Sequence, residues 1–534
     1  MNPKLCIYDK RETAMTSNRG FKIILTASAT EMSDYYDNPF VSFVAGFGKG
    51  PVPLWLARKV LYPPVQRDGD GRAKQAPYGL RKVEALLLES GFSESDVAVV
   101  HPADLDTFVG PETRVIGISS MDPTGMAYVS KTYSSLMGGG EPMNAIEFKR
   151  LVKNQKLRKH KPKIIVGGFG SWQLERKKVA DAYGVDCVII GGGVRTIVEI
   201  FKKAANGEPL PRLVRTENSS AEDDTPLIRH AAIHGSVEIS RGCGRNCQFC
   251  TPTMQRKVDI PLEKIMREVE ITTRGGDSRI TLVTEDLFLY GAKDKSFRPN
   301  KEAVLKLLKS VAAFPGVRSI QPSHMSLTPV VCNPEMVKEA AEILIDKHWY
   351  SHGGKPIVTS ETGIETGSIR LMRKYMAGKT LPFKPEQWKE IVRQAFGILN
   401  DSDWYPLATL IIGLPGETED DVAETLELID DLKDFNAFYV PLLFVPLENC
   451  SLMNKQGAEI DSLTRARWEF LTRCWEYNVR IWRDTFLAHR IQNPVVFELV
   501  KRIVIPYAAK MAGVYYGRKH GVEMENAIWK MATV

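Results

Sequence analysis

The chain lacks several features that would assign it to a class of protein at once. Its 534 residues hold only eight cysteines, too few for the disulfide framework of a small secreted protein. The stretch from Met1 to Gly20 has no apolar core of a signal peptide, and no apolar run is long enough to cross a membrane. The sequence therefore predicts a cytoplasmic protein without a transmembrane segment.

The chain also lacks a large excess of basic over acidic residues. The chain has 71 basic and 64 acidic residues, which gives a formal net charge of +7. Such an excess is compatible with an anionic ligand, but a solvated basic surface explains it more simply, and no nucleic-acid partner is expected. With 43% hydrophobic and 25% charged residues, the chain has the composition of a globular protein, and its length allows two or three domains.

Three of the eight cysteines lie close together. Cys243, Cys247 and Cys250 occur in Arg241-Gly-Cys-Gly-Arg-Asn-Cys-Gln-Phe-Cys250. Three thiolates at this spacing can bind three irons of a [4Fe–4S] cluster and leave the fourth iron open. The alternative is a zinc site, which needs a fourth Cys or His, and His234 lies at no usual zinc spacing. An iron–sulfur cluster is therefore favoured.

The N-terminal half, from Phe21 to about Gly207, alternates short apolar runs with amphipathic stretches. Residues at helical spacing, such as Leu80, Val83 and Leu87, indicate helices between the runs. This alternation predicts an α/β fold with a doubly wound, Rossmann-like parallel sheet, whose ligands bind beyond the carboxyl ends of the strands. The predicted strands are Phe21–Ala27, Val97–Val100, Arg114–Ser119, Lys163–Val166 and Asp186–Ile190.

Two further segments of this half stand out. Glycine-rich turns, Gly167-Gly-Phe-Gly170 and Gly191-Gly-Gly193, follow two of the strands and permit close approach to a bulky ligand, although tight turns alone also use glycine. The segment from Thr26 to Pro64 is too long for an ordinary connection. An ordered lid or substrate wall and a structural insertion explain it equally well.

The cysteine spacing C-x-x-x-C-x-x-C, with Phe249 just before the last cysteine, resembles the signature of the radical SAM superfamily. The resemblance implies a partial (β/α)6 TIM barrel over 236–455, with reactive groups at the C-terminal strand ends. It also implies that the three cysteines bind the cluster and that the open iron binds S-adenosylmethionine (SAM). Other segments that resemble the family, in order, are Ser236–Ser240, Ile280–Asp286, Ser319–Ser323 with His324 at its tip, Pro356–Ser368, Arg373-Lys-Tyr375, Leu407–Thr418 and Phe438–Val445. The residues that the resemblance assigns to the SAM site are Phe249, Glu285, Asp286, Glu365 and Gly413.

The first 207 residues resemble the cobalamin-binding domain of cobalamin-dependent radical SAM enzymes. The chain departs from that group at two strand ends. Ser119-Ser-Met-Asp-Pro-Thr-Gly125 stands where some cobalamin proteins carry a D-x-H-x-x-G loop, and Gly191-Gly-Gly-Val-Arg195 replaces an acidic G-E-G-E. Cobalamin is therefore expected without a histidine ligand from this loop. The residues placed beside cobalamin by the resemblance are Ser119, Ser120, Asp122, Gly167, Gly168, Gly191 and Gly192.

The resemblance implies a C-methyltransferase that uses two SAM molecules to methylate an unactivated sp3 carbon. One SAM yields a 5′-deoxyadenosyl radical that removes hydrogen, the other remethylates cobalamin, and no catalytic residue beyond the cofactor ligands is required. The segment Thr26–Asp34 resembles archaeal members, some of which modify side chains of methyl-coenzyme M reductase. The implied partners are a protein or peptide substrate, with a glutamine of that enzyme as acceptor, and an electron donor such as ferredoxin or flavodoxin.

Other functions compete with this one. A radical SAM enzyme acting on an archaeal lipid or another small molecule without methylation, and a non-catalytic corrinoid or iron–sulfur carrier, both remain open. A methylthiotransferase needs three more cysteines for a second cluster, and only Cys6 and Cys187 precede Cys243. The cysteine count therefore argues against a methylthiotransferase.

The remaining segments are expected to connect and pack. Residues 208–235 contain Pro209, Pro211 and a polar run, which is typical of a linker. A mainly helical C-terminal domain is expected over 456–534, with one apolar stripe packed against the barrel. The stripe consists of Trp468, Leu471, Trp475, Trp482 and Phe486.

Overall fold

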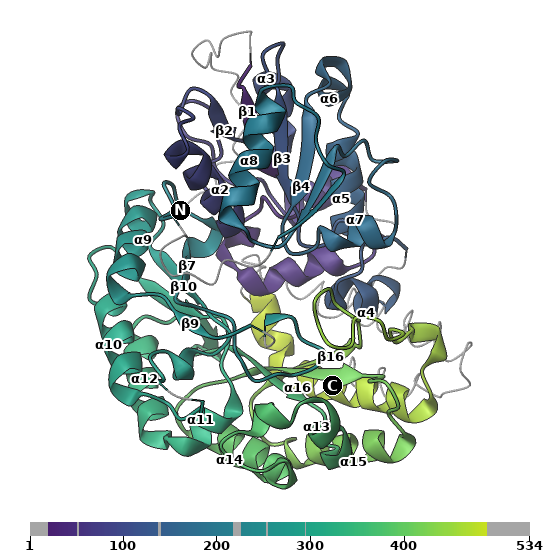
Figure 1. Ribbon diagram of the computed structural model, residues 1–534. Coiled ribbons are helices and arrows are strands. Elements are labelled where there is room, and N and C mark those ends of the chain that lie inside the picture. The colour runs from purple at the N-terminus through teal and green to yellow at the C-terminus, as the bar shows by residue number, and fades with distance from the viewer. Residues whose placement is uncertain are drawn as a thin grey trace.

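The computed structural model describes residues 20–50, 53–136, 140–216, 226–252, 255–293 and 295–488. These residues form an α/β sheet and a partial barrel, which lie one above the other in Figure 1. Among them, no helix combines the length and the apolar character needed to span a membrane.

Six parallel strands form the sheet of the first half, in the order β2-β1-β3-β4-β5-β6. All five predicted strands are present, and each is a short buried run rich in apolar residues, as expected for strands covered on both faces. The chain reverses its direction of travel across the sheet between β1 and β3, which is where such sheets bind ligands. The strands are β1 (Ile23–Ala27), β2 (Val97–Val99), β3 (Val115–Ser119), β4 (Lys163–Gly167), β5 (Cys187–Ile190) and β6 (Leu213–Arg215).

Helices cover both faces of this sheet (Figure 1). Ile23 of β1 shares a core cluster with Leu80 and Phe201, whereas the next residue, Ile24, belongs to a cluster with Phe148. Consecutive side chains of a strand point to opposite faces, so both faces are buried. The predicted doubly wound fold is confirmed. The helices are α2 (Tyr78–Glu89) and α8 (Val194–Ala205) on one face, and α5 (Met143–Val152) and α7 (Trp172–Arg176) on the other.

The stretch expected to be a linker, 208–235, contains one of these strands. β6 pairs in parallel with β5, so that Val214 lies beside Ile189. Leu213 and Val214 pack against the cores of the first half. Two adjacent apolar residues among prolines and charges give no periodic pattern, which is why the sequence did not reveal this strand.

The second half consists of six parallel strands in two ladders, β7-β10-β11 and β14-β15-β16. A parallel bridge between His324 and Glu361 joins the ladders, and the Met325 N–H donates to the Glu361 carbonyl at 2.9 Å. The predicted partial (β/α)6 barrel is confirmed. The strands are β7 (Ser236–Glu238), β10 (Arg279–Val283), β11 (Ser319–Pro322), β14 (Glu361–Glu365), β15 (Leu407–Ile412) and β16 (Phe438–Leu443). The outer helices are α9 (Leu262–Arg274), α10 (Lys301–Ala312), α12 (Pro334–Asp346), α13 (Ile369–Tyr375), α14 (Trp388–Asp401) and α15 (Glu419–Asp431).

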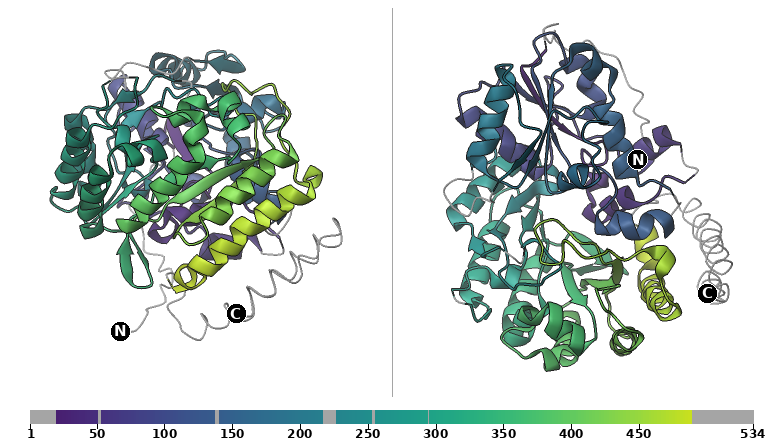
Figure 2. Two further views of the ribbon diagram at one scale, coloured as in Figure 1. Left: turned by 90° about the horizontal axis from the view of Figure 1, so that it is seen from below. Right: turned by 45° about the vertical axis from the view of Figure 1, so that its right-hand side comes forward.

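Helix α16 (Arg465–Ala488) runs along the edge of the barrel (Figure 2). Asn478 accepts a hydrogen bond from the Tyr439 N–H at 2.7 Å and donates to the Tyr439 carbonyl at 2.6 Å. Because β16 is the last strand of its ladder, these bonds satisfy part of an otherwise open strand edge.

The apolar stripe expected in this region packs as predicted where the structure describes it. Trp468 and Leu471 are buried, and Trp475 contacts the ring of Phe438 at the start of β16. The side chains of Trp482 and Phe486, and the rest of the predicted C-terminal domain to Val534, lie outside the described residues.

The long segment after β1 joins the two halves. Within it, residues 34–47, here called the clasp, contact residues at the beginning of the barrel strands. The His234 Nε2–H donates to the Asp34 carbonyl at 2.7 Å, and Asp37 forms an ion pair with Arg279, the first residue of β10. The Trp349 indole N–H donates to the Asp37 carbonyl at 2.9 Å.

The clasp continues to the other side of the barrel. Its aromatic residues Phe40, Phe43 and Phe47 pack with Leu407 and Phe438, the first residues of β15 and β16. These contacts lie at the N-terminal ends of the strands, whereas the cysteines follow a C-terminal end. For residues 34–47, these contacts favour a structural insertion over a wall of the cysteine site.

Candidate active site

The cysteine loop follows β7. Instead of one strand to Ser240, the chain forms a short antiparallel hairpin, β8 (Ser240–Arg241) with β9 (Val258–Asp259). Gly242 has a φ of 71°, and a Cβ there would lie 2.5 Å from the Arg256 carbonyl oxygen. Glycine is required at this turn, which directs the chain into the loop.

The loop closes on its own backbone and buries its thiols. The Cys243 N–H donates to the Pro252 carbonyl, and the Cys250 N–H donates to the Cys247 carbonyl, each at 3.1 Å. Cys243 and Cys247 are buried, Cys250 is half-buried, and none of the three forms a disulfide. Burial raises the pKa of Cys247 to about 11.

Arg245, between the first two cysteines, fastens the loop to the barrel. Only 4% of its surface is exposed, and its guanidinium stacks on the Phe297 ring at 4.5 Å. A buried cation requires acceptors for its hydrogen bonds, and here these are backbone carbonyls and hydroxyls at 3.1–3.2 Å. The acceptors are the carbonyls of Gly378, Lys379 and Leu381 and the hydroxyls of Ser326 and Thr328.

Helix α4 (Tyr128–Leu136) of the first half reaches into the barrel. The Tyr128 hydroxyl donates to the carbonyl of Phe249 at 3.4 Å, and the Tyr133 hydroxyl donates to the carbonyl of Pro441 at 2.8 Å. Phe249 itself is buried. The first half therefore touches the cysteine loop directly.

The two acidic residues after β10 differ in their surroundings. Asp286 is buried, accepts hydrogen bonds from the N–H and the hydroxyl of Ser326, and lies 3.6 Å from Arg245. Its carboxylate is thus engaged within the protein. Glu285 instead lines a cavity, and burial raises its pKa. Of these two predicted SAM contacts, Glu285 is the one that faces a space for a ligand.

His324 and Glu361 form an ion pair at the bridge between the ladders, with 3.0 Å between Nε2 and Oε2. Their side chains are 45% and 32% exposed although the bridge is central to the strands, so they face the barrel interior. Burial alone would lower the pKa of His324, but Glu361 and Glu285 raise it to about 9. His324 is therefore an imidazolium at neutral pH.

The turn after β14 holds Glu365 beside the cysteine loop. Glu365 has a φ of 65° at a bulge in the ladder, and its Oε1 accepts from the Lys379 ammonium at 3.0 Å. Arg373 and Lys374, the basic residues expected near this turn, are exposed, and Arg373 pairs with Glu386. Lys379 is the cation that pairs with Glu365 at this turn, and the sequence did not reveal it.

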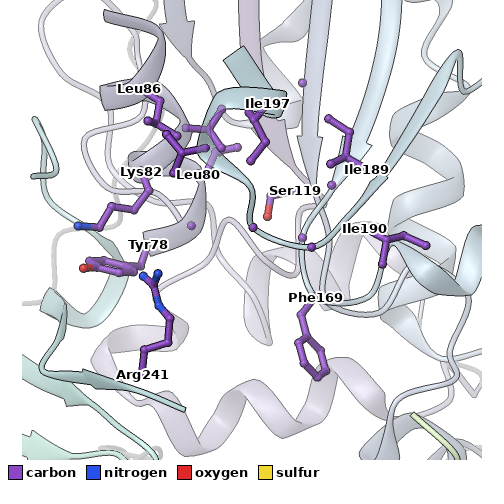
Figure 3. A pocket seen from close by; sticks show the side chains of 18 of the residues that line it. Tyr78, Leu80, Lys82, Leu86, Ser119, Phe169, Ile189, Ile190, Ile197 and Arg241 are labelled. Atoms are coloured by element: carbon purple, nitrogen blue, oxygen red, sulfur yellow. The ribbon is translucent and has the colours of Figure 1, made fainter. Parts of the chain in front are cut away.

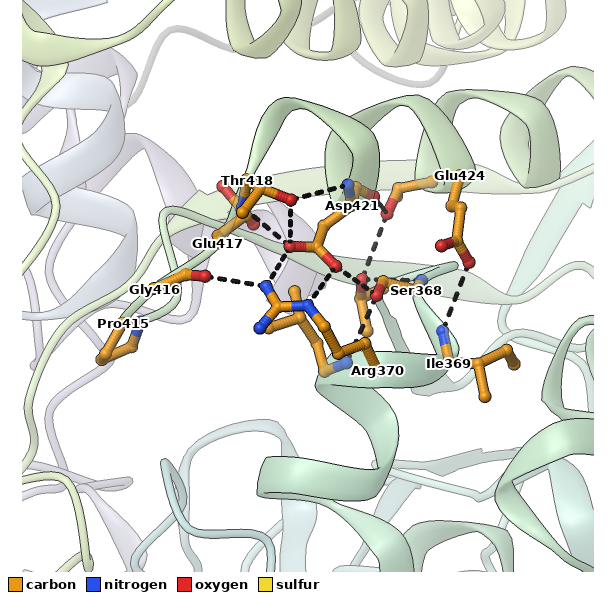
Figure 4. Close-up of polar contacts among 12 residues, drawn as sticks. Ser368, Ile369, Arg370, Pro415, Gly416, Glu417, Thr418, Asp421 and Glu424 are labelled. Carbon is orange, nitrogen blue, oxygen red and sulfur yellow. Dashed lines mark hydrogen bonds and ion pairs between the residues drawn. The ribbon is translucent and has the colours of Figure 1, made fainter.

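Figure 4 shows the contacts that join the turn after β14 to the turn after β15. Asp421 accepts from the Ser368 hydroxyl at 2.6 Å and from Arg370, which also donates to the Gly416 carbonyl at 2.7 Å. Gly413 begins the second turn with a φ of 80°. Both turns that the resemblance assigns to SAM are thus held in a fixed relation.

A cavity of about 470 Å³ lies between the carboxyl edge of the sheet and the cysteine loop (Figure 3). Its deep end extends between the sheet and the helices α2 and α8, and its mouth carries polar side chains from both halves. The deep end is lined by Leu25, Gly117, Ile165, Ile197 and Phe201. The mouth is lined by Tyr78, Lys82, Arg241, Gly242, Thr251, Pro252 and Glu285.

The predicted cobalamin contacts divide into two groups. Ser119, Gly167, Gly168, Gly191 and Gly192 line the cavity.

Ser120 and Asp122 are instead buried within their loop, where Ser120 donates to Glu31 at 3.0 Å and Asp122 accepts from the Gln173 amide at 2.9 Å. Gly168, with a φ of 92°, also serves packing, because a Cβ there would lie 2.7 Å from the Ser120 backbone.

Residues 237–429 match the radical SAM superfamily. They form a radical SAM domain. Curated relatives that the chain matches include methylthiotransferases, and the chain spans about half the length of those described here. A tRNA-2-methylthio-N(6)-dimethylallyladenosine synthase of Thermotoga petrophila is 25% identical over 51% of this chain and 57% of its own. The Thermus thermophilus synthase is 28% identical over 52% of this chain and 55% of its own length. The ribosomal protein uS12 methylthiotransferase RimO of Nitratiruptor is 24% identical over 44% of this chain and 51% of its own length.

Solved structures resemble both halves of the chain. The radical SAM methyltransferase TsrM of Kitasatospora setae, with tryptophan substrate and a SAM analogue bound, gives a TM-score of 0.51 at 12% identity, over 81% of this chain and 75% of that chain. TsrM with cobalamin and a [4Fe–4S] cluster bound gives a TM-score of 0.50 at 12% identity, over 96% of this chain and 99% of that chain. At this identity the likeness concerns the fold.

A radical SAM domain uses a [4Fe–4S] cluster and SAM, and the cysteine loop fits that cluster. Within the described parts of the chain, no group of three or more His, Cys, Asp or Glu side chains is arranged to hold a single metal ion. Ligands to three corners of a cubane do not converge on one metal. His234, considered above as a zinc ligand, is bonded to the Asp34 carbonyl. Iron requires the cysteines as thiolates; burial raises the pKa of Cys247, and the cations Lys379 and Arg245 partly offset this rise.

Proposed function

We propose that the protein is a cobalamin-dependent radical SAM C-methyltransferase that methylates an unactivated sp3 carbon. The observation that carries this proposal is the shared cavity. It runs from the strand-end glycines Gly167 and Gly191 to Gly242 of the cysteine loop. A cofactor bound at the sheet would therefore lie next to the cluster and SAM, as methyl transfer to a radical requires.

Each wall of the cavity has a role in this function. The glycines and Ser119 would border cobalamin. The apolar deep end of the cavity, called the apolar slot from here on, lies beside Gly117 and would hold an uncharged part of cobalamin. Cys243, Cys247 and Cys250 would bind the cluster, and Glu285 would accept hydrogen bonds from the SAM ammonium. Cobalamin supplies a transferable methyl group, and the cluster with SAM supplies one-electron chemistry.

The methyl acceptor proposed here is a protein side chain, specifically a glutamine of methyl-coenzyme M reductase. The resemblance of Thr26–Asp34 to archaeal enzymes supports this choice. The Glu361 carboxylate, which pairs with His324 and is 32% exposed, also offers an acceptor for the N–H groups of a side-chain amide. A cytoplasmic location and reduction by ferredoxin or flavodoxin belong to the same proposal.

The test is anaerobic incubation of the reconstituted protein with deuteriomethyl-SAM, a low-potential reductant, cobalamin and a peptide carrying the glutamine. We expect a labelled methyl group on a carbon of the glutamine, located by mass spectrometry. A peptide with asparagine at that position, and a Cys247→Ala variant with the original peptide, should give no labelled product. 5′-Deoxyadenosine without methyl transfer would favour a non-methylating enzyme, and no 5′-deoxyadenosine would favour a carrier.

A methylthiotransferase is the second candidate, because the curated relatives carry that name. Before Cys243, the only cysteine among the described residues is Cys187, which is buried in β5. A second cluster would raise the iron content above about four per chain and would add sulfur to the product. Methyl transfer without sulfur would exclude this candidate.

A further inference from the structure

Lys379 is a buried lysine beside the cysteine loop that the proposed function leaves without a role. Its side chain is 13% exposed, and it donates to Glu365, whose side chain is 9% exposed, at 3.0 Å. A buried ion pair contributes little to stability, because desolvation offsets much of the attraction between the charges. Folding stability therefore does not explain this ion pair, and its place beside the cysteine loop points to another role.

The backbone holds Lys379 firmly against the cysteine loop. Arg245 donates to the carbonyls of Gly378 and Lys379, and the Gln248 N–H donates to the Tyr375 carbonyl at 2.9 Å. A Cβ on Gly378 would lie 1.9 Å from the Arg245 carbonyl oxygen, so only glycine allows the two segments to approach this closely. The segment with Lys379 and the loop with Cys247 thus form one packed unit.

The two members of the pair carry opposite charges and lie next to the cysteine loop. The Lys379 carbonyl accepts a hydrogen bond from Arg245 at 3.1 Å, and the Lys379 ammonium donates to Glu365 at 3.0 Å. Their side chains lie over Gly363, where a Cβ would be 1.9 Å from the Glu365 carboxylate and 2.5 Å from the Lys379 ammonium. The two charges are therefore held over the end of β14, on segments that pack against the cysteine loop.

We propose that the Lys379–Glu365 pair tunes the reduction potential of the cluster bound by the cysteine loop. Reduction by one electron, taken from an external low-potential donor, adds one negative charge to the cluster. A buried cation stabilises that added charge and a buried anion opposes it, because screening is weak in the interior. Lys379 therefore raises the potential, and Glu365 lowers it. Both are positioning residues, and the inference rests on the cluster of the proposed function.

The experiment is an anaerobic redox titration followed by electron paramagnetic resonance, on reconstituted protein without SAM. Lys379→Met is expected to lower the midpoint potential and Glu365→Gln to raise it, with the double variant between the two. Lys379→Arg, which keeps the charge, is expected to restore the wild-type potential. Lys374→Met, at an exposed lysine on the neighbouring helix, serves as the matched control and should not shift it.

The outcomes of this experiment distinguish a failure of the inference about Lys379 and Glu365 from a failure of the proposed function. Shifts of Lys379→Met and Glu365→Gln in the same direction would indicate a distorted loop and would overturn the inference, as would unchanged potentials in both. Weaker SAM binding by Lys379→Met at an unchanged potential would make Lys379 a SAM ligand and would overturn it too. Absence of a cluster from the wild-type protein would instead reject the proposed function.

Discussion

Ser368 donates a hydrogen bond of 2.6 Å from its hydroxyl to the carboxylate of Asp421, and this contact ties the turn after β14 to the first turn of α15. Arg370 and Thr418 bond to the same carboxylate. Burial by itself would raise the pKa of Asp421, but these three partners outweigh it and hold the pKa well below its ordinary range. One side chain thus keeps two loops of the radical SAM domain in register.

Replacement of this carboxylate should weaken the fold and change its response to acid. A carboxyl group with a depressed pKa contributes stability above its unfolded value of about 3.9, and this is lost as the pH falls toward the folded value. We expect Asp421→Asn to lower the free energy of unfolding at pH 7 by about 1–3 kcal/mol, and the difference from wild type to shrink below pH 4. Urea unfolding at several pH values measures both. Asp420→Asn, at the exposed neighbour, should have little effect, and equal losses from the two variants would contradict the assignment.

The ion pair of His324 and Glu361 predicts the opposite pH dependence. A histidine with a raised pKa contributes stability that is complete below about pH 6.5 and is lost as the pH rises through about 9. His324→Gln should therefore be less stable than wild type at pH 6, with a difference that disappears above pH 9 in urea unfolding. His348→Gln, at an exposed histidine, is the control. A deficit that persists unchanged at pH 10 would show that charge is not the cause.

The apolar slot predicts a specific effect on cobalamin binding. A Cβ on Gly117 would lie 2.6 Å from the Leu25 side chain and 2.7 Å from the Phe201 ring, and these side chains line the slot. Displacing them into the cavity costs about 1–3 kcal/mol, so Gly117→Ala should weaken cobalamin binding by about tenfold. Gly79 also lines the cavity but has open space around its Cβ position, so Gly79→Ala should bind normally. Absorption titrations give both affinities, and equal affinities would rule out binding in this slot.

The cysteine loop predicts that Cys243, Cys247 and Cys250 are the thiols that bind iron. Cys250→Ala should lose the cluster, because a cubane with only two protein ligands is poorly held, and iron should fall from about four per chain toward zero. Cys332→Ala, which changes a partly exposed cysteine outside the loop, should keep its iron. Iron analysis and the reduced resonance spectrum measure this after anaerobic reconstitution. Full iron in Cys250→Ala would refute the ligand assignment.

Elements with a strong local signal were predictable from the sequence. The strands of the first half other than β6 were found because each is a buried apolar run with a turn signal at its end, as for Cys187–Ile190 before Gly191. The barrel strands were found from the resemblance to the radical SAM superfamily, since a strand such as β14 is not an apolar run. The cysteine loop was found because ligand spacing survives in sequence. β6 was missed because it owes its pairing to the neighbouring β5, not to its own pattern.

The parts of the site that depend on contacts between distant segments were not predictable. Asp286 and Glu285 are adjacent in sequence, yet only Asp286 meets Ser326, 40 residues later, and turns away from the cavity. Lys379 was overlooked in favour of Arg373, because which lysine or arginine points inward depends on the loop that packs above it. The SAM and cobalamin contacts assigned by resemblance stay predictions.

The clasp has a consequence for the order in which the protein assembles during synthesis. Phe40, Phe43 and Phe47 leave the ribosome long before Leu407 and Phe438, the residues that cover them. Helix α4 of the first half can cover part of these rings early, but until the barrel is made the rest of their surface faces water on a nascent chain, where apolar surface is prone to aggregate. The first half can complete its sheet early, but it reaches its final state only when the last barrel strand has been made.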